Sequence, residues 1–300
     1  HAWPTLTQYL LNMLDRHTEE DYLTPRVFRR ACTWLEENRE NDPWFLWIDS
    51  FAPHERWDPP MEFADAYCTT TESRNYIQPQ LINRAEPSEA EIERTKALYH
   101  GYVTFVDKWI GVFLDKLAGM HLLDDTLVVF TSDHGTELWD KDRFGKGGDR
   151  LYRYNTGIPL IVRLPGGLDG GTVREDFVQH QDLLPTICDL MDAPCPPTLG
   201  QSLVPALSSG VHAAHERVYT TFNGKATGMP SHVTVTTPTH TAIIPRLPRE
   251  PELYDRRSDP EQLTDVAAAH PELVAQLHGD LIDFMREQGA EEAYVTEYLR

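Results

Sequence analysis

Three short and largely apolar runs most constrain the fold of this chain. They are residues 44–48 (WFLWI), 126–131 (TLVVFT) and 158–162 (IPLIV). A strand that is apolar at successive positions has no polar face to turn toward water, so it suits the interior of a sheet covered on both sides by helices. The three runs therefore predict the central strands of an α/β domain.

Helical patterns separate these runs. Residues 26–40 carry apolar side chains on one face, and a short helix is expected over 182–191. Ser88 has the character of an N-cap before acidic residues, and apolar positions then recur at helical spacing until Gly119. Residues 61–88 are polar and without clear period, which predicts an irregular, lid-like excursion. Alternating strands and helices favour a mostly parallel sheet covered by helices.

The pattern changes after about residue 205. Residues 218–222 and 233–236 are rich in β-branched residues and alternate in polarity, with turn residues at 223–224 and 237–238. A helix is expected from about 271 to 288. We therefore predict two domains: an α/β domain over 1–205 and a small C-terminal subdomain over 206–300, made of an antiparallel sheet and a helix.

Composition excludes several classes of protein. The 27 basic and 47 acidic residues give a net charge of -20, which opposes binding to nucleic acids or anionic membranes. No stretch approaches the roughly 18 apolar residues of a membrane span. The four cysteines form no C-x-x-C pair, and a disulfide between Cys188 and Cys195 stays open. A soluble protein is expected, in the cytoplasm or the periplasm, and its oligomeric state is left open.

Ligands of open α/β sheets bind at the carboxyl ends of the parallel strands. Asp133 and His134 follow the second apolar run directly, where a carboxylate and an imidazole can bind a cation. Gly135 lets the chain turn sharply beside them. Asp133 could equally cap a turn, so the Asp-His-Gly triplet alone does not establish a cation site. The candidate residues in the other loops are needed to support it.

Two further loops carry candidate residues. Lys146 lies among glycines (GKGG, residues 145–148) that permit close approach of an anion to the backbone. His54 follows the first apolar run and could act as a general acid. Either side chain alone could be an ordinary surface residue, but all three loops fall at one edge of the predicted sheet.

At this point the residues resemble a known family, the sulfatases. Residues 43–54 (PWFLWIDSFAPH) resemble the family's central strand and histidine loop. The second metal-ligand loop and the lysine loop of the family are similar to TSDHG (131–135), GKGG (145–148) and IPL (158–160). The helix that follows in the family resembles DLLPT (182–186). The entry to the family's C-terminal subdomain resembles ELYD (252–255) with DPE (259–261). In order and spacing, the resemblance runs from about residue 24 to 288.

The resemblance implies an alkaline phosphatase-like fold and hydrolysis of sulfate esters of small molecules or carbohydrates. It implies that Asp133 and His134 are ligands of one divalent metal, Ca²⁺ in preference to Mn²⁺ or Mg²⁺. It further implies that Lys146 and His54 contact the sulfate and that His54 protonates the leaving oxygen. Two alternatives remain: a phosphonate monoester hydrolase or phosphodiesterase of the same superfamily, or a sulfatase-like domain without catalysis.

The chain also departs from the family pattern. None of its four cysteines lies in the Cys-x-Pro-Ser-Arg motif, whose cysteine is oxidised to formylglycine, and the family's first metal-binding aspartate pair is not found. Both would lie upstream of His1. We therefore expect a C-terminal portion of a sulfatase, with formylglycine only in the preceding region and without activity on its own.

Overall fold

The computed structural model describes residues 4–68, 70, 74–84, 86–147, 149, 151–209, 215–222, 232–246 and 249–299. The chain forms two compact units. Unit 1 comprises His1–Val128, Leu138–Gly145 and Arg163–Leu168, and unit 2 comprises Val129–Glu137, Lys146–Val162 and Asp169–Arg300. None of the helices in the described part of the chain is long and apolar enough to cross a membrane.

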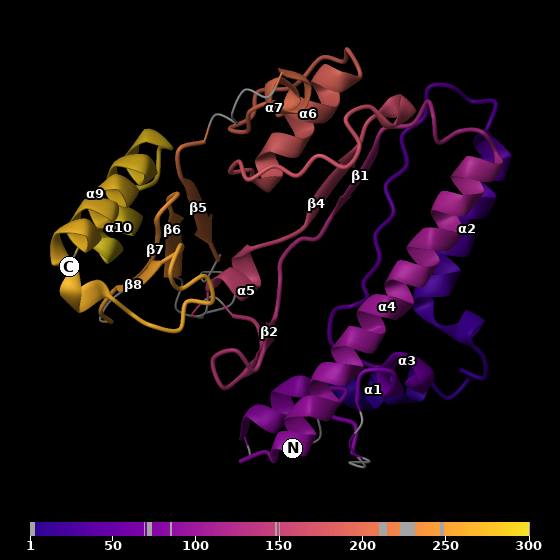
Figure 1. Ribbon diagram of the computed structural model, residues 1–300, viewed down its shortest axis with the longest axis horizontal. Helices are drawn as coiled ribbons and strands as arrows, with labels where there is room; N and C mark the ends of the chain where they lie inside the picture. The colour runs from indigo at the N-terminus through magenta and orange to yellow at the C-terminus, as the bar shows by residue number, and fades with distance from the viewer. Residues whose placement is uncertain are drawn as a thin grey trace. The chain divides into compact units, whose positions relative to one another are not determined.

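Unit 1 is built around helix α4. The other helices of this unit, some of them visible beside α4 in Figure 1, are α1 (Pro4–Asn12), η1 (Glu19–Asp21), α2 (Leu23–Asn38), α3 (Met61–Asp65), η2 (Pro79–Arg84) and η3 (Pro165–Gly167). Helix α4 spans Glu89–Gly119, and Ser88 caps it as predicted: its Oγ accepts a hydrogen bond from the Glu91 amide, while the Glu91 carboxylate accepts one from the Ser88 amide.

The apolar stripe of α4 is buried, as its spacing predicted. Its members pack against α2, α3 and the aromatic side chains of the intervening loops, and Leu98 and Phe105 are fully buried. The predicted helix over 26–40 is α2, which buries Phe28, Ala31 and Leu35 against α4. The excursion predicted over 61–88 was only partly right, because it contains α3 and η2.

The expected strand at 44–48 was wrong. This segment has no regular secondary structure in the described chain. Its side chains alternate: Trp44, Leu46 and Ile48 pack against the core of unit 1, whereas Phe45 and Trp47 are 69% and 72% exposed. The backbone thus has the alternation of a strand, but within the described residues no neighbouring strand pairs with it.

The other two apolar runs form strands. β1 (Val128–Thr131) pairs with β4 (Leu160–Arg163), although Phe130 and Ile161 remain exposed. The shorter elements around them are β2 (Glu137–Leu138), β3 (Phe144–Gly145), α5 (Arg153–Thr156), η4 (His180–Asp182), α6 (Leu183–Leu190) and α7 (Val204–Ser209). Helix α6 is the one predicted over 182–191.

The predicted antiparallel sheet is confirmed, within unit 2. Its strands are β5 (Val218–Thr221), β6 (His232–Thr236), β7 (His240–Pro245) and β8 (Glu252–Asp255), adjacent in chain order. One face packs against helix α9 (Pro271–Glu287), the predicted C-terminal helix, as Figure 1 shows. The remaining short elements are η5 (Ala267–Ala269), α10 (Glu292–Val295) and η6 (Thr296–Tyr298).

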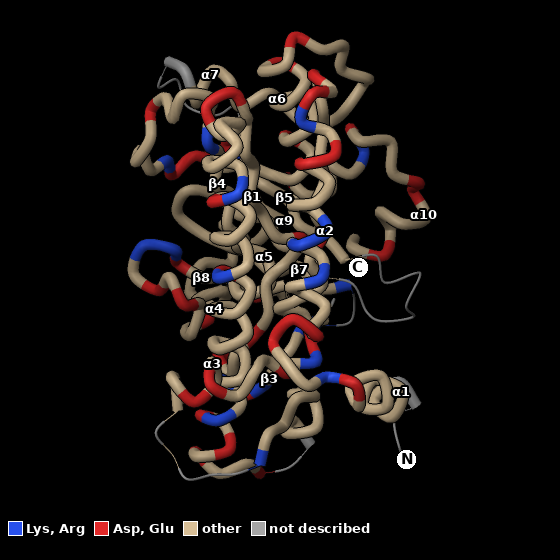
Figure 2. Tube along the Cα trace, turned by 90° about the vertical axis from the view of Figure 1, so that its right-hand side faces the viewer, with Lys and Arg blue, Asp and Glu red and all other residues tan. Residues whose placement is uncertain are grey.

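Other predictions have mixed outcomes. The turn at 237–238 is confirmed, because the Thr237 hydroxyl accepts a hydrogen bond from the His240 amide at 3.0 Å, whereas 223–224 lies outside the described residues. All four cysteines are free thiols. Acidic and basic residues are interspersed along the described trace (Figure 2). The domain boundary at residue 205 stays a prediction.

Candidate functional site

Asp133 and His134 lie in the turn that follows β1, in unit 2. The Asp133 side chain is 84% exposed, and one of its oxygens accepts a hydrogen bond from the His134 amide at 2.9 Å. The other oxygen lies 3.4 Å from Nε2 of His134. Ligand atoms lie about 2.3–2.6 Å from a bound Ca²⁺. Two neighbouring ligand atoms of one ion are therefore separated by a distance close to the 3.4 Å between Asp133 and His134.

The orientation of the His134 ring also suits a metal ligand. Nδ1 lies 2.8 Å from the carbonyl oxygen of Gly135. When Nδ1 carries the proton it donates to this carbonyl, and the lone pair of Nε2 then faces the Asp133 carboxylate. The donors therefore fit a divalent cation. They supply only part of a shell, because the described residues contain no group of three His, Cys, Asp or Glu side chains placed to hold a metal.

Gly135 is required where it stands. A Cβ at this position would lie 1.9 Å from the carbonyl oxygen of Tyr154, far inside van der Waals contact. The Gly135 amide also donates to the Asn155 carbonyl at 3.0 Å. This close approach fixes the turn that carries Asp133 and His134 against the segment that leads to β4.

Glu137 is a buried carboxylate in the same loop that no sequence motif had marked. It is fully buried and accepts a hydrogen bond from Nδ2 of Asn155 at 3.2 Å. Its position two residues after Gly135 was visible in the sequence, but an acid near a turn is common and nothing in the pattern indicated burial.

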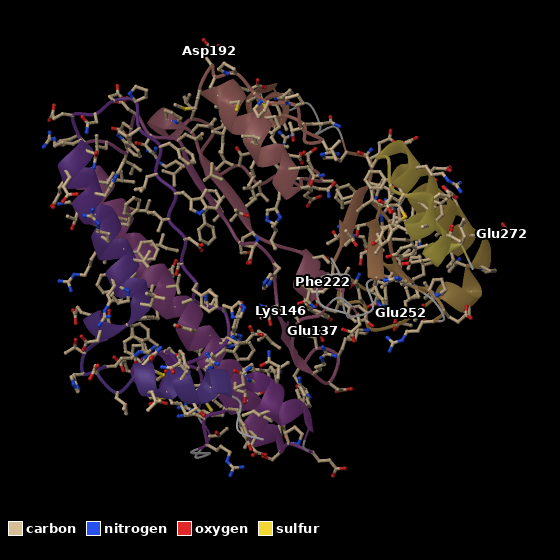
Figure 3. The ribbon with its side chains drawn as sticks, turned by 180° about the vertical axis from the view of Figure 1, so that it is seen from behind. Glu137, Lys146, Asp192, Phe222, Glu252 and Glu272 are labelled. Carbon is tan, nitrogen blue, oxygen red and sulfur yellow. The ribbon has the colours of Figure 1, made fainter. Side chains whose placement is uncertain are left out.

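Lys146 follows β3 and belongs to unit 2, with its side chain partly exposed. Figure 3 labels it together with Glu137. The preceding residue, Gly145, has φ of 103°, a conformation that favours glycine, so the Gly-rich sequence does serve the turn that presents the lysine.

His54 lies in unit 1, in a turn closed by its own amide donating to the Phe51 carbonyl at 2.9 Å. Its ring stacks on Phe51 with centroids 4.4 Å apart. Nδ1 lies 2.6 Å from the Glu55 carbonyl and 3.2 Å from the Glu55 carboxylate. These contacts orient the ring and leave its side chain 35% exposed.

A polar hub around Asp182, next to the turn of Asp133 and His134, was not predicted. Asp182 is fully buried, and it accepts hydrogen bonds from the amides of Gln179 and Gln201 and lies 2.9 Å from Nε2 of His215. Nε2 of His180, in the same turn as Asp182, lies 2.8 Å from the Ser132 carbonyl. The 3-10 helix η4, which leads into α6, therefore contacts the residue that precedes Asp133.

Comparisons with known proteins identify the family of the chain. Residues 2–193 match the sulfatase family, and residues 143–287 match the C-terminal region of N-sulphoglucosamine sulphohydrolase. An arylsulfatase of Clostridium perfringens (strain 13 / Type A) is 23% identical over 305 residues, which cover 93% of this chain and 60% of the relative. The chain thus spans less than two thirds of that relative's length.

Two solved structures show the fold. The phosphonate monoester hydrolase of Agrobacterium radiobacter aligns with a TM-score of 0.74 at 22% identity, covering 91% of this chain and 62% of the other. A protein in complex with its substrate D-glucosamine-2-N,6-O-disulfate aligns with a TM-score of 0.70 at 19% identity, covering 88% and 69%. Both likenesses support the alkaline phosphatase-like fold. With the family match extending from residue 2 to 193, the chain belongs to the sulfatase family.

Proposed function

We propose that the protein hydrolyses sulfate esters, and that Asp133 and His134 hold part of the divalent metal site. The observation that carries this is the 3.4 Å approach of the His134 Nε2 to the Asp133 carboxylate, in the turn after β1 of a sulfatase-family chain. Oxygen donors with one imidazole suit a hard cation, and Ca²⁺ is our choice over Mn²⁺ or Mg²⁺. Bound there, the ion would stabilise negative charge on a sulfate oxygen.

Lys146 and His54 have separate roles in this proposal. Lys146 is a compact positive charge on a flexible stem, suited to a sulfate oxygen, and Gly145 allows the chain to turn before it. With Nδ1 of His54 held by Glu55, Nε2 is the atom that would give a proton to the departing alcohol. The substrate class is a small-molecule or carbohydrate sulfate ester.

The nucleophile is not among these proposed residues. The chain contains no Cys-x-Pro-Ser-Arg sequence in which a formylglycine could form. We therefore propose that residues 1–300 alone do not turn over a sulfate ester, and that they carry part of the active site. Release of sulfate from 4-nitrophenyl sulfate by the purified 300-residue chain would contradict this part of the proposal.

Calcium binding by the protein from its complete reading frame tests the metal assignment without any need for activity. Asp133→Asn removes one anionic ligand, so we expect Ca²⁺ to bind at least about tenfold more weakly in isothermal titration calorimetry. Asp192→Asn is the matched control, since Asp192 is exposed in a turn after α6 at φ of 49°, which asparagine also tolerates. Equal Ca²⁺ affinity of the two variants would refute the assignment.

A phosphonate monoester is the second candidate substrate. The fold is shared with a phosphonate monoester hydrolase, and a lysine with a divalent cation binds either tetrahedral anion. Rates on 4-nitrophenyl sulfate and 4-nitrophenyl phenylphosphonate, measured in parallel on the protein from its complete reading frame, distinguish the two. Sulfate turnover with the higher kcat/KM is expected. A protein that binds Ca²⁺ and turns over neither ester would be a non-catalytic member of the family.

A further inference from the structure

The antiparallel sheet of unit 2 has two faces of different chemistry. On one face Val233, Val235, Ala242, Ile244 and Leu253 pack against α9. Because successive side chains of a strand alternate, their neighbours point to the opposite face. The register places Val218 opposite Thr236, and Thr236 opposite Thr241. That second face is largely polar, with Thr220, His232, Thr234, Thr236, Thr241, Glu252 and Tyr254.

This polar face is covered by protein. The Thr234 hydroxyl donates to the Leu151 carbonyl at 2.6 Å, and the Tyr152 hydroxyl donates to the Glu252 carboxylate at 2.9 Å. Thr234 and Thr241 are only 1% and 4% exposed. A buried sheet face is normally apolar, and here the hydrogen bonds to Leu151 and from Tyr152 offset part of the cost of burying polar groups.

Beside this contact lies a pocket of about 420 Å³, entirely within unit 2. The sheet contributes Thr220, Thr236 and Thr241 to its wall, and the segments before α6 and after β8 contribute Gln179, His180 and Arg256. The size lies within the range of small-molecule sites. Asp133, His134 and Lys146 are not among the lining residues.

Arg256 is the group in this pocket that points to a ligand. Its guanidinium donates to the Thr237 carbonyl at 2.7 Å and lies 5.0 Å from the ring centre of Phe177. Within the described residues, no carboxylate forms an ion pair with it. Burial, together with the positive charge of Arg153, lowers the pKa of Arg256 from its usual value.

The other charged groups of the pocket are already paired. Arg153 lies 3.1 Å from the Glu261 carboxylate, and Asp176 lies 3.0 Å from Nε of Arg174. A half-buried guanidinium beside a second arginine is stabilised by an anion, because the anion offsets both the lost hydration and the repulsion between the two cations.

We propose that this pocket binds an anionic monosaccharide, with its sulfate or carboxylate on Arg256 and its ring hydroxyls on the threonines and Gln179. An oxyanion can accept two hydrogen bonds from a guanidinium, while hydroxyl and amide side chains match the alternating donors and acceptors of a sugar. The site needs no metal and no nucleophile, so the proposal stands independently of sulfate-ester hydrolysis.

Binding of glucose 6-sulfate to the full chain, followed by isothermal titration calorimetry without metal, tests the site. We expect Arg256→Gln to weaken binding at least about tenfold, and Arg256→Lys, which keeps the charge, to weaken it less. Arg257→Gln is the matched control, because Arg257 is the exposed next residue, and its affinity should equal that of the unaltered chain. Equal thermal midpoints of the Arg256 and Arg257 variants show that both are folded.

Titrations with two other sugars show which anionic group the pocket recognises. Glucuronate in place of glucose 6-sulfate shows whether a carboxylate serves as well as a sulfate, and glucose should not bind. The proposal is overturned if Arg256→Gln binds glucose 6-sulfate as tightly as Arg257→Gln does, or if the unaltered chain does not bind it at tens of millimolar. It is also overturned if Lys146→Gln, and not Arg256→Gln, abolishes binding, since the ligand then occupies the lysine loop.

Discussion

Two glycines of unit 2 differ in what surrounds them. The Cβ of an alanine at Gly135 would lie 1.9 Å from the Tyr154 carbonyl oxygen, whereas at Gly279, inside α9, it would meet nothing within 4 Å. We expect Gly135→Ala to lower the free energy of unfolding by about 1–3 kcal/mol. Gly279→Ala should raise it by about 0.5–1 kcal/mol, because alanine is the better helix former.

Urea unfolding of both variants, monitored by circular dichroism, gives the comparison. Gly135→Ala should also weaken Ca²⁺ binding, since the turn that it distorts carries Asp133 and His134. A variant Gly135→Ala as stable as Gly279→Ala would show that the turn does not depend on this close approach.

His232 is the residue that should make stability depend on pH. It is 4% exposed, and neither ring nitrogen has a hydrogen-bond partner among the residues that the structure describes. Burial, with the charge of Arg249, lowers the pKa of His232 below its usual 6.5, against the opposing effect of Asp149 and Glu252. As pH falls through about 6.5, the unfolded chain binds the proton before the folded chain does, so stability is lost.

The expected result for His232→Gln is a smaller loss of stability between pH 7.5 and pH 5.5 than in the unaltered chain. Thermal midpoints at the two pH values measure this. His100→Gln is a useful comparison, because burial also lowers the pKa of His100, in unit 1. An unchanged pH dependence in His232→Gln would show that this histidine does not contribute.

At the scale of elements, α4 shows what local sequence determines. Its cap residue, its apolar spacing and its end were all predicted, because a helix is specified by contacts three and four residues apart. Ser88→Ala removes the cap, and we expect a loss of about 1 kcal/mol in the free energy of unfolding. Ser88→Asp should restore most of it, because aspartate also caps. If Ser88→Ala and Ser88→Asp unfold at the same urea concentration, the cap contributes nothing.

The segment at 44–48 shows what local sequence cannot determine. Five consecutive apolar residues fit a buried strand, yet a strand exists only where a neighbouring backbone pairs with it. Phe45 and Trp47 are exposed while Leu46 packs inward, so the alternation was hidden by the apolar character of both faces. Conversely, the alternation of 218–222 and 233–236, the segments of β5 and β6, predicted a small antiparallel sheet, but not that its polar face is buried.

The candidate site shows the same limit of local sequence. Asp133, His134, Lys146 and His54 stood out because family motifs and strand ends mark them, and their roles remain proposals. Glu137 and His215 did not stand out, and Asp182 was noted only as the first residue of the segment DLLPT (182–186). Their importance lies in contacts between distant parts of the chain, such as Asp182 with His215, and no short-range pattern records these.

At the scale of the whole molecule, the sulfatase family match extends over residues 2–193, whereas the chain covers 60% of the Clostridium arylsulfatase. With a net charge of -20, the chain as a whole repels an anion, so sulfate binding depends on the few cations next to the sulfate. Loss of a single lysine there should therefore weaken catalysis strongly. Lys146 is the cation that we place on the sulfate, and Lys141, five residues earlier, has no assigned role.

The most direct test is release of inorganic sulfate from 4-nitrophenyl sulfate, with Ca²⁺, by the protein produced from its complete reading frame. We predict turnover by the unaltered protein and by Lys141→Gln, and a kcat/KM lower by about 10²–10³-fold in Lys146→Gln, the size expected for loss of a group that stabilises developing charge. No sulfate release by the unaltered protein, or equal kcat/KM in the two lysine variants, would contradict the account.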